Sequence, residues 1–170
     1  MVNKKFHYIQ GQKGAMLLEL LFMLPLLSLL LISVAGAFFL VVRLYFHELS
    51  DLELEEQVRL ATANIVTDIK YADKAEIMQD GIRIWTRRRS SGGQRWFDYQ
   101  IRTPISGGKI MKDGQPLTGD SMYGDIRITK FYFEKPNERT VFFEIQGINK
   151  ITGKVFSLET GAAMQNQKND

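Results

Sequence analysis

The feature that most constrains this chain is a continuous apolar run near its N-terminus. Residues 15–42 form a stretch of 28 residues without lysine, arginine, histidine or aspartate. At about 1.5 Å of rise per residue, a helix of that length exceeds the roughly 30 Å hydrocarbon core of a bilayer. The run therefore predicts a helix that spans a membrane.

One carboxylate interrupts this run. Glu19 lies five residues after Gly14 and is the only ionisable residue in the stretch. An ionisable side chain in a membrane span costs about 2.5–3.5 kcal/mol near the bilayer centre and less near an end, and it marks a functional site by default. Because the charge needs a partner, we expect Glu19 to pair with a positive group, and the nearest candidate is a newly made amino terminus.

These residues resemble the class III signal of type IV prepilins and pseudopilins. The resemblance consists of a basic leader with Lys4, Lys5 and Lys13, Gly14 before the cut, Ala15 after it and Glu19 at mature position five. It implies cleavage between Gly14 and Ala15 by a prepilin peptidase on the cytoplasmic face, usually with N-methylation, and assembly into a fibre. It also implies that Glu19 pairs with the terminal amine of a neighbouring subunit, so that two charges in an apolar core neutralise each other.

Two features depart from the family pattern. The family usually has phenylalanine as its first mature residue and often threonine as its third, whereas this chain has Ala15 and Leu17, which leaves methylation open. Pro25 lacks the donor that would bond the carbonyl of Leu21, so it predicts a kink or a loosening of the helix. The proline is either one that a membrane helix tolerates or a place where the helix bends on leaving the bilayer.

An ordinary secretory signal does not fit the segment, because its apolar region would span only about 7–15 residues. An uncleaved anchor helix fits the length but explains neither the glutamate nor the glycine. Three lysines precede the span, so the positive-inside rule predicts a cytoplasmic N-terminus and an extracytoplasmic C-terminal part. We expect a single pass through the cytoplasmic (inner) membrane, followed by a pilus or pseudopilus.

Length and charge limit the rest of the chain. The predicted organisation is a leader at 1–14, a membrane and assembly half of the helix at 15–44, and one extracytoplasmic domain at 45–170. Removing the leader deletes three lysines and no acidic residue, so the mature chain holds 19 basic and 19 acidic residues. A generally basic, nucleic-acid-binding surface is therefore not supported. There is no cysteine, so the domain must be held by packing alone.

After the span, the sequence predicts a second, amphipathic part of the same helix at 45–73. Apolar residues recur there at steps of three and four, at Leu54, Val58, Ala61, Ile65, Ile69 and Ala72. Such a stripe must pack against something, and a sheet can cover it.

Beyond Gly81 the period changes to two, which predicts an antiparallel sheet at 82–164. A hairpin is expected at 82–89 and 95–102, with further strands at 108–112, 126–134, 140–148 and 154–160, all separated by turn residues. The predicted fold class is α+β, with a long N-terminal helix packed on an antiparallel sheet. Pattern and resemblance both point to a pilin-like architecture.

The C-terminal half is similar to one subclass. Its strand rhythm and the end at Gln165-Asn166 resemble J-type minor pseudopilins of type II secretion and the related F-type minor pilin of competence systems, which close near an Arg-Asn pair. The resemblance is loose, because it rests on the strand rhythm and one asparagine.

The sequence offers no catalytic constellation. The two histidines, His7 and His47, lie in the leader and at the membrane exit, without a second ligand for zinc and without a Ser-His-Asp arrangement in the domain. We expect no enzymatic activity, no cofactor and no metal. The only basic patch with interleaved aromatic residues is Arg87, Arg88, Arg89, Arg95 and Trp96. Such a patch suits single-stranded nucleic acid, but solvated charges at a hairpin tip explain the same residues and are the preferred interpretation, so nucleic acid is not supported as a partner.

The expected function is that of a minor pilin or pseudopilin subunit of a type IV pilus, a competence pilus or a type II secretion pseudopilus. Its partners would be the prepilin peptidase, the membrane and other subunits through the N-terminal helix. Two alternatives stay open: a major pilin of such a fibre, and a membrane-tethered extracytoplasmic binding domain that does not polymerise.

Overall fold

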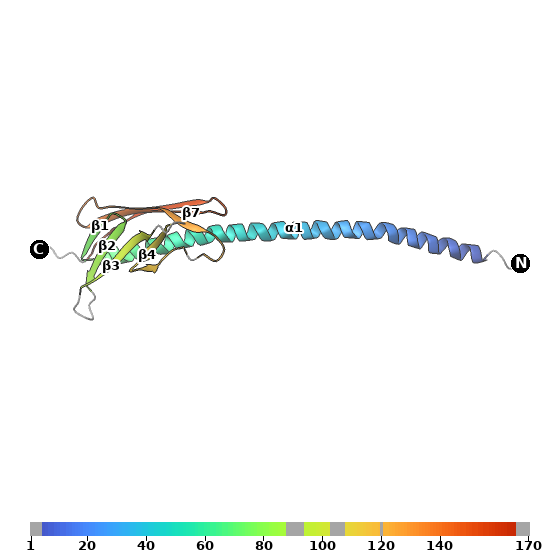
Figure 1. Ribbon diagram of the computed structural model, residues 1–170, viewed down its shortest axis with the longest axis horizontal. Coiled ribbons are helices and arrows are strands. Elements are labelled where there is room, and N and C mark those ends of the chain that lie inside the picture. Colours follow the sequence, from blue (N-terminus) through green and yellow to red (C-terminus); the bar gives the residue numbers. More distant parts are fainter. Residues whose placement is uncertain (1–4, 88–93, 103–107, 120, 166–170) are drawn as a thin grey trace. The chain divides into compact units, whose positions relative to one another are not determined.

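The computed structural model describes residues 5–87, 94–102, 108–119 and 121–165, without the side chains of residues 5–14, 87, 94, 95, 101 and 102 (Figure 1). A helix, α1 (Lys5–Lys70), precedes the strands. The chain divides into two compact units, Met1–Tyr45 and Phe46–Asp170. The described part of the first unit is helix only, and the second holds the rest of α1 and the described strands.

The strands of the second unit form two antiparallel sheets. A five-stranded sheet has the order β1 (Lys74–Met78), β2 (Gly81–Arg87), β3 (Gln94–Arg102), β4 (Lys109–Lys112) and β5 (Gln115–Pro116). A three-stranded sheet has the order β6 (Ile126–Glu134), β7 (Thr140–Asn149) and β8 (Val155–Ala163). An isolated bridge between Gly108 and Ile128 connects them.

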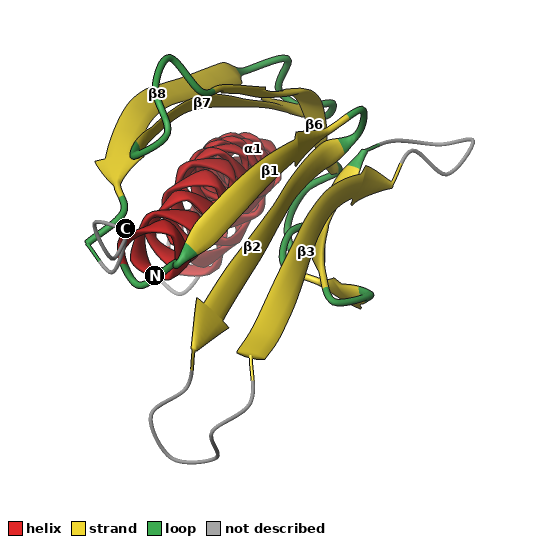
Figure 2. Cartoon of the chain, turned by 90° about the vertical axis from the view of Figure 1, so that its left-hand side faces the viewer, coloured by secondary structure: helices red, strands yellow, loops and turns green. Residues whose placement is uncertain are grey.

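The helix segment of this unit lies between the two sheets, as the end-on view in Figure 2 shows. Its apolar stripe is completely buried: the exposed fraction is 0% at Leu54, Val58, Ala61, Ile65, Ile69 and Ala72. Burying the four large members stabilises the fold by about 6–12 kcal/mol, at about 1.5–3 kcal/mol each. The sequence prediction of an α+β fold with a long helix packed on antiparallel sheet is confirmed.

A buried polar contact joins the helix to the five-stranded sheet. The hydroxyl of Tyr99, whose side chain is fully buried, donates to Oδ2 of Asp68, and the ammonium of Lys112 lies 2.6 Å from the same oxygen. Burial, reinforced by the hydrogen bond to the Asp68 carboxylate, raises the pKa of the Tyr99 hydroxyl far above its usual value. The phenol therefore stays protonated and remains a donor.

A β-bulge explains the burial pattern of the three-stranded sheet. In β6, Ile126 and Ile128 are buried, and so is Phe133, five residues further on, which a strict period of two would place on the opposite face. The register against β7 shifts between Ile128 and Lys130. The extra residue turns the second half of the strand over, so apolar side chains of both halves reach the core.

Several features differ from the sequence-based expectation, among them the short strand β5 at Gln115–Pro116, which was not expected. The helix ends at Lys70, and β1, at Lys74–Met78, was not expected as a strand. Its sequence contains no glycine, proline or alternating pattern, and only pairing with β2 makes it a strand. The single sheet expected at 82–164 is two sheets, and among the described residues an isolated bridge between Gly108 and Ile128 is the pairing that joins them.

Gly147 in β7 allows a close approach of this strand to the helix. A Cβ atom at this position would lie 2.7 Å from Cδ1 of Leu54 and 3.3 Å from Cγ2 of Val58. We expect Gly147→Ala to lower the free energy of unfolding by about 1–3 kcal/mol, as overpacking does. Urea unfolding of the detergent-solubilised chain would measure this.

A double-mutant cycle with Leu54→Ala provides the control. Because Leu54→Ala removes the clashing methyl group, Gly147→Ala should cost markedly less in that background. Equal costs in both backgrounds would contradict the packing described here.

Candidate functional site

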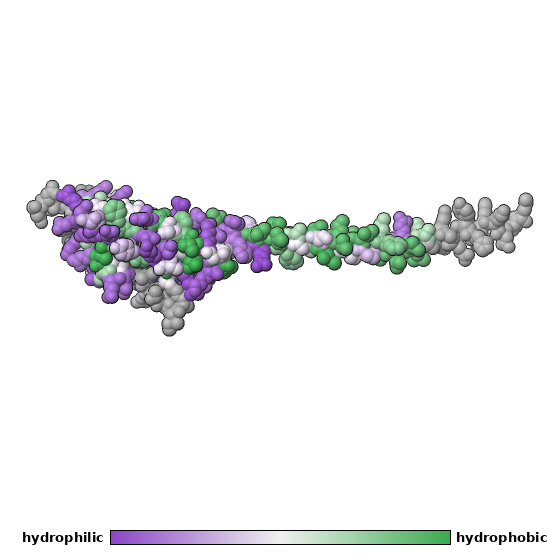
Figure 3. Space-filling model, turned by 90° about the horizontal axis from the view of Figure 1, so that it is seen from above, coloured by the Kyte–Doolittle hydropathy of each residue, from purple (hydrophilic) through white to green (hydrophobic). Residues whose placement is uncertain are grey.

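The exposed surface of the first unit is the most unusual feature of the molecule. Every leucine, isoleucine, valine, methionine and phenylalanine from Met16 to Val41 is at least 56% exposed, and Figure 3 shows this segment as a hydrophobic cylinder. The helix is long and apolar enough to cross a membrane. Such a surface requires lipid or protein around it, because contact of so much apolar surface with water is unfavourable.

Glu19 lies on this cylinder as an exposed residue. Within the described part of the chain, no side chain forms a hydrogen bond or an ion pair with it. It is also the only ionisable residue at positions 15–42. Among the described side chains, none therefore supplies a counter-charge for Glu19.

The predicted cleavage point lies inside α1. The backbone at Gly14 and Ala15 is helical, and the Ala15 side chain is exposed. Processing between these two residues remains a prediction.

The helix continues through Pro25 without a break. One turn further on, the hydroxyl of Ser28 donates to the carbonyl of Leu24 at 2.8 Å, and Ser33 does the same to Leu29. These bonds within the helix satisfy hydroxyl groups that face an apolar environment. The kink predicted at Pro25 remains a prediction.

The hairpin patch predicted from the sequence is only partly described. Arg88 and Arg89 lie outside the described residues, whereas Arg87 and Arg95 lie in the paired parts of β2 and β3. Trp96 in β3 is 51% exposed and is a residue of the sheet face rather than of the core.

The partner of Trp96 is a residue that the sequence analysis did not single out. The guanidinium of Arg83 lies 4.9 Å from the centroid of the Trp96 ring. The same group forms two hydrogen bonds with the carboxylate of Asp98, the second of them 2.7 Å long. Those bonds raise the pKa of the Arg83 guanidinium. Cross-strand pairing could have suggested this contact, but only after the register was known.

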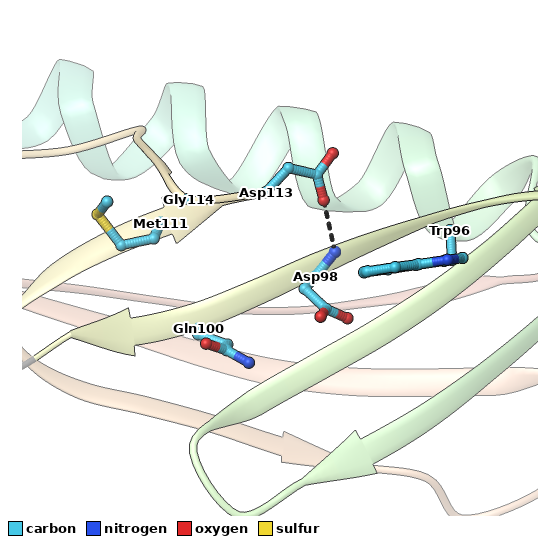
Figure 4. A pocket seen from close by; sticks show the side chains of 6 residues that line it. All are labelled: Trp96, Asp98, Gln100, Met111, Asp113 and Gly114. Carbon is cyan, nitrogen blue, oxygen red and sulfur yellow. Dashed lines mark hydrogen bonds between the residues drawn. The ribbon is translucent and has the colours of Figure 1, made fainter.

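A shallow pocket of about 250 Å³ lies beside Trp96 on the same sheet face. Figure 4 shows its lining, which consists of Trp96, Asp98, Gln100, Met111, Asp113 and Gly114. The turn that closes it is held by two bonds: Asp98 N donates to Oδ1 of Asp113, and Asp113 N donates to the carbonyl of Asp98, both at 2.9 Å. Two carboxylates in this lining disfavour a phosphate backbone next to Trp96.

The described residues include no group of three histidine, aspartate or glutamate side chains placed to hold a metal ion. The pocket contains no histidine and is smaller than the roughly 300–1,000 Å³ typical of sites for small molecules.

Comparison of the chain with known proteins gives no matching family model, no similar curated protein and no similar solved structure.

Trp96 and Tyr99 provide a direct comparison of surface and core. We expect Trp96→Ala to lower the free energy of unfolding by about 1 kcal/mol, because half of the side chain is already in water. Tyr99→Ala should cost about 3–5 kcal/mol, because it leaves a cavity and removes the hydrogen bond that the Asp68 carboxylate accepts from the phenol. Urea unfolding followed by circular dichroism would measure both, and a similar cost for the two variants would place Trp96 in the core.

Proposed function

We propose that this chain is a minor pilin or pseudopilin subunit. In this proposal, prepilin peptidase cleaves it after Gly14, and it then joins other subunits through α1 in a type IV pilus, a competence pilus or a type II secretion pseudopilus. The chain is not an enzyme in this account. Its mechanism is assembly.

The observation that carries the proposal is the division of one helix into two surfaces. From Met16 to Val41 the apolar side chains are exposed on all sides, whereas from Leu54 onward a single stripe is buried under the sheets. A helix that is apolar all round is stable only in lipid or in a bundle of similar helices. A fibre subunit needs both environments in turn, first the bilayer and then the fibre core.

Glu19 supplies the second argument. A membrane anchor gains nothing from a carboxylate in its apolar run, which costs free energy wherever it remains unpaired. The amine of a processed N-terminus can neutralise it, and the pair would then fix the axial position of one subunit against the next. Removing one member of such a buried pair typically costs about 3–5 kcal/mol. Axial positions in which Glu19 meets no amine would therefore be strongly disfavoured.

The minor role is favoured over that of a major pilin by Ala15 and Pro25, which depart from the usual helix, and by the similarity of the C-terminal strands to J-type minor pseudopilins. The third interpretation, a tethered binding domain, needs the span but neither the cut nor Glu19. Processing therefore separates a pilin from a tethered domain, and copy number in fibres separates a minor subunit from a major one.

Processing is tested by intact mass and N-terminal sequencing of the membrane-extracted chain, with and without a co-expressed prepilin peptidase. We expect peptidase-dependent loss of residues 1–14. Gly14→Ala should block the loss, because the peptidase site would no longer accept the residue before the cut.

Gly36→Ala is the matched control. It makes the same change in the same helix, and no atom lies within 4 Å of the added Cβ, so this variant should be processed normally. A chain that begins at Met1 under both conditions would refute the proposal and leave a signal-anchored domain.

Assembly is tested at Glu19. We expect Glu19→Gln to be processed normally but to be depleted at least about tenfold from sheared fibres, because about 1.4 kcal/mol of lost pairing is already a factor of ten. Immunoblots of the sheared and membrane fractions would measure this.

Glu19→Asp keeps the charge and should retain part of the incorporation. Equal incorporation of the glutamine variant and the native chain would exclude the pairing. Copy number in the same sheared fraction distinguishes a minor subunit from a major one.

A further inference from the structure

Four exposed apolar side chains gather at one end of the second unit. They are Phe46 (49% exposed), Met122 (84%), Tyr123 (41%) and Ile151 (57%). Phe46 is the first residue of the unit, Met122 and Tyr123 lie between β5 and β6, and Ile151 lies in the turn between β7 and β8. We call these four residues the rim.

The loop that carries Met122 and Tyr123 is fixed to the helix. The carboxylate of Glu53 accepts hydrogen bonds from Ser121 Oγ at 2.7 Å, from Met122 N at 2.9 Å and from Tyr123 N at 3.2 Å. The ring of Tyr123 lies 6.2 Å from that of Phe46. These contacts hold the loop in one position, so the exposure of Met122 does not come from a free loop tip.

The turn that carries Ile151 is fixed to the same stretch of helix. Asn149 is fully buried, and its amide donates to Ser50 Oγ at 2.6 Å and to Asp51 Oδ1 at 2.9 Å. Its own Oδ1 accepts from Ile151 N at 3.0 Å. Lys150 N donates to the carbonyl of Asp125 at 2.9 Å, which connects this turn to the loop of Met122.

The rim therefore consists of Phe46 on α1 and two segments that are bonded to the next two turns of the same helix. Two acidic residues of those turns, Asp51 and Glu53, use their carboxylates to hold the loop and the turn. Surface loops normally present polar tips, and apolar side chains that are held outward indicate a contact surface.

The position of Phe46 in the chain indicates what covers this surface. It follows the last residue of the apolar run, Val42, by four residues, or about 6 Å along a helix. The interfacial zone on each side of a bilayer is about 5–8 Å deep, given a hydrocarbon core of about 30 Å in a membrane of about 40–45 Å. Aromatic side chains are enriched in that zone. Segments bonded to the helix within two turns of Phe46 lie close to the point where the chain leaves the bilayer, whatever the inclination of the span.

We propose that the rim contacts the headgroup region of the bilayer, with Met122 and Ile151 inserted at the boundary with the acyl chains. The proposal rests on the membrane span alone and does not depend on cleavage or on fibre assembly. The contact seats the domain on the membrane surface while the span remains in lipid.

The chain has no cysteine, so single nitroxide labels can be placed without removing native thiols. Met122→Cys and Ile151→Cys report on the rim, and Leu27→Cys reports on the span. Ala163→Cys is the aqueous reference, because Ala163 is exposed and lies near the end of α1 that is far from the rim. The two residues after it are bonded to the backbone of Arg139 and of Lys70, the last residue of α1. Lys70 is about 36 Å of helix away from Phe46.

The measurement is continuous-wave electron paramagnetic resonance on the full chain. Nanodiscs of phosphatidylethanolamine and phosphatidylglycerol would hold one chain each. Power saturation compares the accessibility of each label to molecular oxygen, which concentrates in lipid, with its accessibility to a water-soluble nickel chelate. We expect the labels at Met122 and Ile151 to be several-fold less accessible to the chelate than the label at Ala163, and to show the preference for oxygen seen at Leu27.

Labels at Met122 and Ile151 that are as accessible to the chelate as the label at Ala163 would overturn the proposal. Protection that occurs only when several chains share one disc would also overturn it, because the rim would then be covered by a second copy. Near-ultraviolet circular dichroism confirms that each labelled variant is folded, and the two independent rim positions guard against a local effect of either label.

Discussion

The packing of one apolar helix stripe between two sheets is the constraint on which the rest of the second unit depends. Leu54, Val58, Ile65 and Ile69 are fully buried, and each contributes about 1.5–3 kcal/mol through the burial of its side chain. Because there is no disulfide to replace it, the sheets cannot separate from this stripe without unfolding. The helix is therefore a fixed part of the domain from Leu54 to its end.

Polar contacts add specificity to this packing. Asp68 bonds the hydroxyl of Tyr99 and the ammonium of Lys112 at one level of the helix, and Ser50 and Asp51 bond Asn149 at another. A hydrogen bond to a charged group contributes about 1.5–3 kcal/mol, but only when both partners meet. These contacts set the register of each sheet along α1, which apolar packing alone defines loosely. The outer face with Trp96 and the rim remain available for other molecules.

Much of this architecture could be predicted from the sequence, because it follows from local periodicity. The six residues of the stripe and the strands β2, β6, β7 and β8 are recognisable from steps of three and four, from alternation and from turn residues. The strand β1 and the division into two sheets could not be predicted, because they depend on partners that are distant in the chain. The bulge in β6 could not be predicted either. In the sequence it appears only as a shift of the buried apolar residues from even to odd positions along the strand.

The residues of the candidate site also fall into two groups, those that the sequence identifies and those that only the fold identifies. Glu19 stands out in the sequence because a single charge in a long apolar run is a property of composition. Arg83 beside Trp96, Asn149 under the β7–β8 turn and Glu53 under the loop of Met122 are ordinary polar residues until the fold brings their partners to them. Arg88 and Arg89, which were predicted to form the hairpin patch, lie outside the described residues.

The central claim is that the apolar half of α1 exchanges lipid for neighbouring helices, with Glu19 at the contact. The most direct measurement places a photoactivatable benzoylphenylalanine at Leu18, next to Glu19, and identifies its adducts by mass spectrometry in membranes and in sheared fibres. The account predicts lipid adducts in the membrane fraction and adducts with the first residues of a neighbouring subunit's helix in the fibre fraction. Lipid adducts alone, with no chain recovered from fibres, would contradict it and leave a tethered domain.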